Sequence, residues 1–169
     1  MPPRRSTRSR ARSARHALAN CGVAAYLAVL AATDPSPGLW LLALVCAYAT
    51  AAFDTVSSEI GQAWGGRPVL ITTLRPVLIG TDGGVSLVGT MSGFAAAALI
   101  AVFAAALGLL PSRAIPVALV AAFIGSTADS YLGATLERKG LMDNEAVNFS
   151  NTLIGALAGI GGALLGGAL

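Results

Sequence analysis

Two aspartates stand inside otherwise apolar stretches of the sequence. Asp54 lies near the end of one apolar run and Asp129 near the end of another. An ionisable side chain within a membrane-spanning helix is costly, so it usually marks a functional site. Ser58 follows Asp54 by one helical turn and shares its face. Carboxylate and hydroxyl oxygens suit a hard cation, so we predict that Asp54, Asp129 and Ser58 bind Mg²⁺ and that both aspartates are catalytic. The alternative is that each carboxylate reaches the membrane interface or caps a neighbouring helix.

A glycine-rich turn, Thr81-Asp82-Gly83-Gly84, precedes the third apolar run. Glycines let a phosphate approach the backbone closely, and a helix N-terminus attracts anions. The alternative is a plain helix cap with a glycine turn. Asp82 and Glu59 are secondary catalytic candidates. The residues that we predict to bind phosphate or nucleotide are Gly83, Gly84, Ser86, Arg75, Asn20, Asn144, Asn148, Arg138 and Lys139.

The composition is that of a membrane protein. Of 169 residues, 55% are hydrophobic and only 11% are charged, whereas a soluble domain carries about 25% charged residues. The apolar runs are continuous rather than alternating, which argues against a β-barrel. No Walker A sequence or Rossmann fingerprint is present, which excludes a standard nucleotide-binding domain. Cys21 and Cys46 both fall within apolar runs, so neither a disulfide framework nor a zinc site is indicated.

The first sixteen residues are basic. They contain six arginines and no acid, which suits a nucleic-acid-binding tail, a transit peptide or a membrane anchor of the positive-inside kind. We favour the anchor and expect no nucleic-acid partner. We therefore predict a basic, disordered cytoplasmic tail over residues 1–16.

The apolar runs predict a single transmembrane domain over residues 17–169. Its fold is an all-α polytopic bundle of about five helices, each able to cross about 30 Å of hydrocarbon with help from flanking residues. With the basic tail inside, the longer loops and the candidate site face the cytoplasm, and the protein is expected in the cell membrane. The predicted helices are about 17–33, 39–60, 85–110, 114–136 and 147–168, and the predicted cytoplasmic loops are 61–84 and 137–146.

The helices that rise from the predicted cytoplasmic side open with a shared pattern. It occurs as Asn20-Cys-Gly-Val23, Asp82-Gly-Gly-Val85 and Asn144-Glu-Ala-Val147. The two descending helices also match near Asp54 and Asp129. These similarities predict an internal, parallel helix–loop–helix repeat. The site should then lie between the two loops, with Asp54 facing Asp129 and the Asp82 turn facing the Asn144 turn.

A set of motifs carries a family resemblance. The strings LANCGVAA, AFDTVSSEIG, RPVLITT, GTDGGVSLVGT, ADSYLGATLE and DNEAVNFSNTLIGA follow one another in the sequence. Together they resemble the integral-membrane family catalogued as domain of unknown function ninety-two, over roughly Arg12 to Leu169. That family includes the plant phytyl-phosphate kinases and animal transmembrane protein nineteen. Here Leu78-Ile79-Gly80 replaces the family's usual Pro-Pro-Gly, Cys21 replaces a glycine, and the additional N-terminal helices expected in longer members are missing.

The resemblance implies a polytopic α-helical fold and, as in the plant branch, nucleotide-dependent phosphorylation of an isoprenyl monophosphate. The leading hypothesis is therefore a phosphotransferase that uses Mg²⁺ and ATP or CTP to convert phytyl or geranylgeranyl phosphate to the diphosphate. A small cation- or proton-coupled transporter and a non-enzymatic assembly subunit are the alternatives, and the short helices also leave a homo-oligomer open. The family signatures fall on Asn20, Asp54, Ser58, Glu59, Asp82, Gly83, Gly84, Ser86, Asp129, Asn144 and Asn148.

Overall fold

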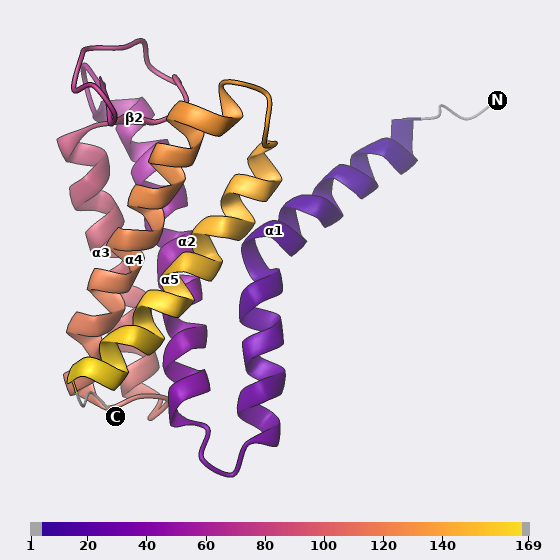
Figure 1. Cartoon of the computed structure of the whole chain (residues 1–169), viewed down its shortest axis with the longest axis vertical. Helices are drawn as coiled ribbons and strands as arrows, with labels where there is room; N and C mark the ends of the chain where they lie inside the picture. Colours follow the sequence, from indigo (N-terminus) through magenta and orange to yellow (C-terminus); the bar gives the residue numbers. More distant parts are fainter. Residues whose placement is uncertain (1–4, 167–169) are drawn as a thin grey trace.

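The protein is a bundle of five helices, which confirms the predicted all-α fold (Figure 1). The computed structural model describes the backbone of residues 5–166 and the side chains of residues 15 and 17–166. Among the described residues four helices are long and apolar enough to cross a membrane, while the apolar part of the first, Ala17–Thr33, is shorter. The helices are α1 (Arg5–Thr33), α2 (Gly38–Trp64), α3 (Leu87–Ala106), α4 (Ile115–Leu132) and α5 (Asn144–Gly166).

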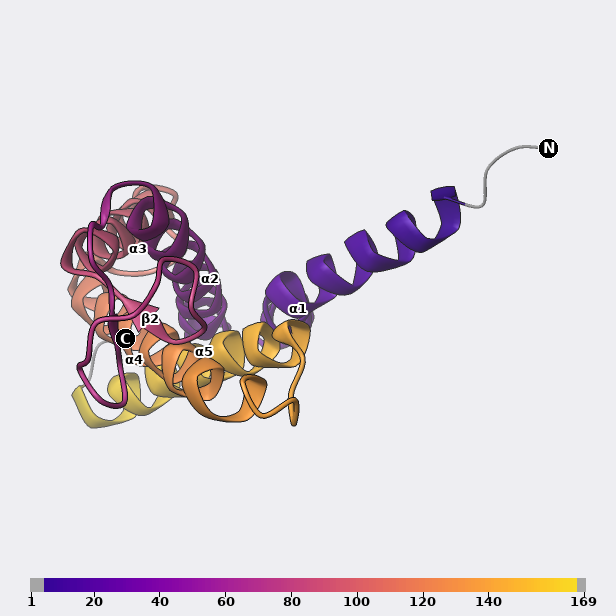
Figure 2. The same cartoon turned by 90° about the horizontal axis from the view of Figure 1, so that it is seen from above.

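Both longer connections lie at one end of the bundle, which we call the loop face (Figure 1). The loop face comprises residues 65–86, between α2 and α3, and residues 138–143, before α5. Seen from above, the α2–α3 connection lies across the ends of the helices, and the first half of α1 points away from the bundle (Figure 2). The α1–α2 and α3–α4 turns lie at the opposite end (Figure 1).

Helix α2 is the centre of the bundle, because it packs against all four other helices. Its contact with α5 depends on glycines spaced one turn apart. A Cβ added at Gly155 would collide with the Thr50 side chain, and one added at Gly159 would collide with Cys46. Small residues at this spacing let two membrane helices approach closely.

The contact between α2 and α3 uses a second glycine pair. A Cβ at Gly89 would lie 2.5 Å from the backbone oxygen of Ser57, and one at Gly93 would lie 2.6 Å from the ring of Phe53. These contacts leave no room for a larger residue. Both glycine pairs therefore fix where α2 sits, and α2 carries Asp54.

The turn between α1 and α2 is organised by Asp34. Its Oδ1 accepts a hydrogen bond from the Ser36 backbone amide at 2.8 Å, and its Oδ2 accepts one from the Trp40 indole Nε1 at 2.6 Å. These two hydrogen bonds hold the pKa of Asp34 below its usual range.

Helix α1 is longer than its apolar run. It begins at Arg5, whereas the sequence predicts a disordered tail over residues 1–16, of which residues 1–4 lie outside the described part. Arginine and alanine are good helix formers, and extending an existing helix needs no new nucleus. As a result Asn20 lies within α1 rather than at its opening.

The other two predicted helix openings are also displaced. Helix α3 begins at Leu87, and its cap is Ser86, whose Oγ accepts from the Gly89 amide at 3.1 Å. Helix α5 begins at Asn144, but Asp143 provides the cap by accepting from the Ala146 amide at 2.9 Å. The shared opening pattern seen in the sequence therefore does not correspond to a shared capping role.

Candidate functional site

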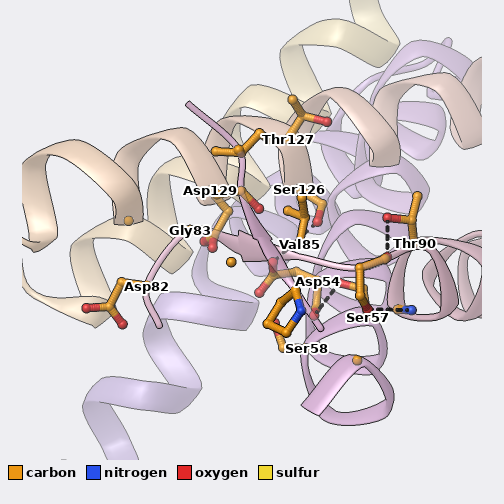
Figure 3. Close-up of a pocket in the computed structure, with 18 of the residues that line it drawn as sticks. Asp54, Ser57, Ser58, Asp82, Gly83, Val85, Thr90, Ser126, Thr127 and Asp129 are labelled. Carbon is orange, nitrogen blue, oxygen red and sulfur yellow. Dashed lines mark hydrogen bonds between the residues drawn. The ribbon is translucent and has the colours of Figure 1, made fainter. Parts of the chain in front are cut away.

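A cavity of about 670 Å³ lies at the loop face, walled by α2, the start of α3, the second half of α4 and the α2–α3 connection (Figure 3). Five carboxylates line it, whereas no described lysine or arginine side chain does. A phosphate could approach this wall only with cations that neutralise the negative charge. The five acids are Asp54, Glu59, Asp82, Asp129 and Glu137.

At the centre of the cavity Asp54 of α2 and Asp129 of α4 lie close enough to interact directly. Ser126 Oγ donates to Asp54 Oδ1 at 3.3 Å, and Asn151 Nδ2 donates to Asp129 Oδ1 at 2.8 Å. Figure 3 shows Asp54, Ser126 and Asp129 gathered together, with the exposed Asp82 farther out. Adjacent carboxylates repel each other, so a shared proton or a cation is needed to hold them together.

The other polar side-chain atom of Asn151, its amide oxygen Oδ1, has unusual surroundings. The residue is only 1% exposed, and its Oδ1 is buried without a hydrogen-bond partner among the described residues. An unsatisfied buried acceptor costs about 1–3 kcal/mol. An amide oxygen in this state, next to a carboxylate pair, has the chemistry of a hard-cation ligand.

The α2–α3 connection covers the cavity as a small hairpin. Strand β1 (Val69–Leu70) pairs antiparallel with β2 (Gly84–Val85). Just before β2, Gly83 has a φ of +75°, and a Cβ there would lie 2.5 Å from the Ser130 oxygen of α4 and collide with Ala134. Only glycine fits this contact, so Gly83 is the point where the connection docks on α4.

The predicted phosphate cradle is not formed in this conformation. The Gly84 amide donates to the Thr81 carbonyl at 2.8 Å, and the Gly83 nitrogen lies against Gly133, just after the end of α4. The Ser86 hydroxyl is engaged as the α3 cap. Both glycines are therefore used for docking and turning the chain, which is the plainer of the two interpretations of this motif. The Asp82 turn accordingly faces the end of α4 rather than the Asn144 turn.

The predicted basic residues are also placed elsewhere. Arg75, Arg138 and Lys139 are exposed and do not line the cavity, because the hairpin and the turn after α4 direct them outward. The other predicted residues do reach the cavity wall. They are Asn20, Asp54, Ser58, Glu59, Asp82, Gly83, Gly84, Ser86, Asp129, Asn144 and Asn148.

One acid of the cavity, Glu137, falls in the predicted loop 137–146 and was not expected at the site. Helix α4 continues into a π-helical turn, Gly133–Glu137, closed by a hydrogen bond from the Arg138 amide to the Gly133 oxygen at 3.3 Å. In a regular α-helix Glu137 would be rotated by roughly 80° from Asp129. The slower rotation of a π-turn brings it back toward the same face.

Two uncharged residues at the site, Ser126 and Asn151, were also missed. Both lie inside apolar runs, where single polar residues are common. Their spacing gave a usable signal, since Ser126 precedes Asp129 by one helical turn. Asn151 belongs to α5, so its contact with Asp129 could not be read from local sequence.

The described side chains contain no cluster of three or more His, Cys, Asp or Glu that could enclose a metal ion. The Asp54–Asp129 pair, with Ser126 and Asn151 behind it, is a two-carboxylate site. Mg²⁺ is commonly held by one or two carboxylates together with substrate phosphates, in contrast to the closed cages of structural metals. The geometry therefore suits a cation shared with a substrate.

Comparisons with known proteins agree on the class of protein. Residues 4–156 match the family described as Integral membrane protein DUF92. An uncharacterized membrane protein of Synechocystis sp. is 44% identical over 141 residues, which cover 82% of this chain and 55% of the relative. One from Methanocaldococcus jannaschii is 37% identical over 153 residues, covering 88% and 61%.

A plant protein is also similar. Protein VTE6, chloroplastic, of Arabidopsis thaliana is 34% identical over 125 residues, which cover 72% of this chain and 38% of that protein. The chain thus spans between about two fifths and three fifths of the length of these relatives. No solved structure matches the chain. With the family matched over most of its length and its helices suited to a bilayer, the chain belongs to the integral membrane protein family DUF92.

Proposed function

We propose that this protein is a membrane phosphotransferase that phosphorylates an isoprenoid monophosphate to the diphosphate, with a Mg²⁺-bound nucleoside triphosphate as donor. The observation that carries the proposal is the Asp54–Asp129 pair inside an acid-lined cavity with no described basic side chain. Such a wall suits phosphates that arrive with their own metal ions. The family resemblance, which implies this activity in the plant branch, supports the same substrate class.

The chain's own residues fit a magnesium ion at the carboxylate pair. Asp54 and Asp129 would be its ligands, Ser126 and Asn151 would orient them, and the buried Asn151 Oδ1, which has no partner among the described residues, would be available as a further oxygen. Ser58, the other predicted ligand, lines the same cavity from α2. When bound, the ion would neutralise phosphate charge, which is the main requirement of phosphoryl transfer.

The proposed reaction needs no general base. A non-bridging oxygen of the acceptor monophosphate, already ionised at neutral pH, attacks the terminal phosphorus of ATP or CTP. A new P–O bond forms, the bond between that phosphorus and the bridging oxygen breaks, and the nucleoside diphosphate leaves with the electron pair. The protein must therefore position two phosphates in line, and cations bound at the acid-lined wall would screen their charges.

The interior below the site favours an enzyme over a transporter. A transporter needs a polar path toward the opposite end of the bundle. Below Thr50, α2 instead presents fully or nearly fully buried Leu42, Val45 and Cys46 to its neighbours. We also propose that the loop face is cytoplasmic, where nucleotide is supplied.

The test is a direct assay of purified protein in detergent or nanodiscs. It contains Mg²⁺, ATP or CTP, and phytyl or geranylgeranyl phosphate, and the diphosphate product is separated by chromatography. Product that depends on both Mg²⁺ and nucleotide is expected. No diphosphate with any nucleotide–lipid pair would overturn the proposal.

A further inference from the structure

Two polar residues at the start of α3 line the acid-lined cavity, and an aromatic residue follows them on the same face of the helix. Ser86 and Thr90 both line the cavity and are one helical turn apart, and Phe94 follows after another turn. Residues at this spacing share one face of a helix. This face of α3 therefore becomes apolar with increasing distance from the loop face, although Phe94 itself does not line the cavity.

The facing edge on α4 also has an aromatic ring at its end away from the loop face. Tyr131, Thr127 and Phe123 line the cavity at successive turns, in the reverse sequence order because the helix runs the other way. Phe123, at that end, meets Phe94 of α3. The rings of Phe94 and Phe123 stack with centroids 5.3 Å apart and planes inclined by 20°.

A third ring forms the back of this aromatic floor. Phe53 of α2 is only 3% exposed and meets Phe94 edge-on, with centroids 5.0 Å apart. Phe123 is different, because it lines the cavity and is yet 41% exposed. One side chain thus belongs both to the cavity wall and to the outer surface of the bundle.

The outer surface beside the contact between α3 and α4 is apolar, as suits the hydrocarbon of a membrane. These two helices touch each other little, since α3 packs mainly on α2 and α4 mainly on α5 and α2. Apolar side chains flank the gap on the outside, with Met91 53%, Val120 58% and Ile124 43% exposed. Phe123 therefore joins the cavity wall to the apolar outer surface of these two helices.

We infer that the gap between α3 and α4 is the binding path for the hydrocarbon tail of the substrate. The inference rests on the proposed function and extends it, because it specifies how a single-chain lipid phosphate lies in the site. The phosphate occupies the acid-lined end with its cations. The tail passes between Thr90 and Thr127, crosses the stacked rings of Phe94 and Phe123, and continues into the bilayer.

Narrowing the gap tests this path by enzyme kinetics. Thr127→Trp is expected to raise the KM for geranylgeranyl phosphate by at least about tenfold, while that for dimethylallyl phosphate, whose tail is too short to reach the rings, changes less than about threefold. Leu157→Trp, at a 57% exposed position of α5, is the matched control and should alter neither.

A binding measurement separates this inference from the proposed function. Benzoylphenylalanine is placed at residue 123 or, as control, at residue 157, and each protein is irradiated with radiolabelled geranylgeranyl phosphate. Labelling at 123 is expected to exceed that at 157 by about tenfold, and unlabelled geranylgeranyl phosphate but not inorganic phosphate should compete.

The outcomes are distinct. Equal labelling at the two positions, or a Thr127→Trp effect that is the same for short and long substrates, would overturn the tail path even if the protein is an active kinase. Specific labelling at 123 without any diphosphate product would retain the tail path and overturn the kinase.

Discussion

Asn151 on α5 holds Asp129 on α4 through a 2.8 Å hydrogen bond from its amide nitrogen, while its amide oxygen has no partner among the described residues. One side chain thus orients a carboxylate and presents a free acceptor beside it. The same amide also ties α5 to the site. This relationship makes Asn151 a positioning residue for the proposed cation.

Replacing Asn151 by alanine should weaken magnesium activation. We expect the Mg²⁺ concentration for half-maximal activity to rise by about 10- to 100-fold, the usual cost of losing a group that orients a metal ligand. Ser150→Ala on the same helix is the control, because its hydroxyl bonds only to the Ala146 oxygen. A loss of activity that extra Mg²⁺ does not restore would assign Asn151 a purely structural role.

Neutralising either central carboxylate should abolish most activity. Asp54→Asn and Asp129→Asn each keep the side-chain shape but remove a proposed cation ligand, so we expect a loss of at least about 10²-fold. Asp143→Asn is a matched control on the same loop face, since asparagine also caps helices and the ion pair with Arg15 is exposed. Comparable activity of Asp54→Asn and Asp143→Asn would contradict a role for the pair.

Adding one methyl group at Gly83 should impair the site. Gly83→Ala places a Cβ against Ser130 and Ala134 at a positive φ, so the hairpin must lift from α4, and we expect about a 10²-fold loss of activity. Gly140→Ala is the control, because it has a similar φ of +69° but nothing within 4 Å of its Cβ. Parallel activity measurements on the two variants separate docking from backbone strain, and equal losses would argue against docking.

The glycine contact between α2 and α5 should govern stability. Gly155→Ala forces a Cβ into Thr50, and we expect a destabilisation of about 1–3 kcal/mol, measured as unfolding of the purified protein in detergent. Gly161→Ala in the same helix has no atom within 4 Å of its Cβ and should be neutral or slightly stabilising. If the two variants unfold alike, the close approach at Thr50 is not needed.

The Asp34–Trp40 hydrogen bond gives a prediction about pH. The pKa of Asp34 is lowered in the folded protein, so its ionised, hydrogen-bonded form persists as pH falls through the ordinary value of about 3.9 and is lost only below it. In a Trp64→Phe protein the fluorescence of Trp40 reports this titration. Its midpoint should lie below that of a free aspartate and disappear in Asp34→Asn, whereas a midpoint at or above the ordinary value would disprove the assignment.

The positions of the two central carboxylates and of the long loops could be predicted from the sequence, because charged residues are rare inside membrane helices. Asp54 and Asp129 are conspicuous against apolar surroundings. Because successive helices run in opposite directions, the two carboxylates and both long loops must lie at the same end of the bundle. Glycine spacings such as Gly155 and Gly159 indicate close packing in the same way. Their partners on α2 required the structure, since spacing identifies a face and not what it meets.

The chemistry of the loops was harder to predict. Arg75, Arg138 and Lys139 share the site's end of the bundle, yet none lines the cavity, because a loop residue has no fixed periodicity from which its direction could be inferred. Glu137 reaches the cavity through a π-turn that no propensity rule signals. The sequence also does not show whether a backbone amide is free to bind a phosphate. The Gly84 nitrogen, for example, already donates a hydrogen bond within its own turn.

The two glycine pairs that pack against α2 also determine where Asp54 lies along the axis of the bundle. They fix the axial register of this helix at Cys46, Thr50, Phe53 and Ser57, on both sides of Asp54. A slip of one residue would move the carboxylate by about 1.5 Å and rotate it by roughly 100° away from Asp129. The position of Asp54 beside Asp129 is therefore set by close contacts that carry no charge, so that uncharged glycines determine the geometry of an acidic site.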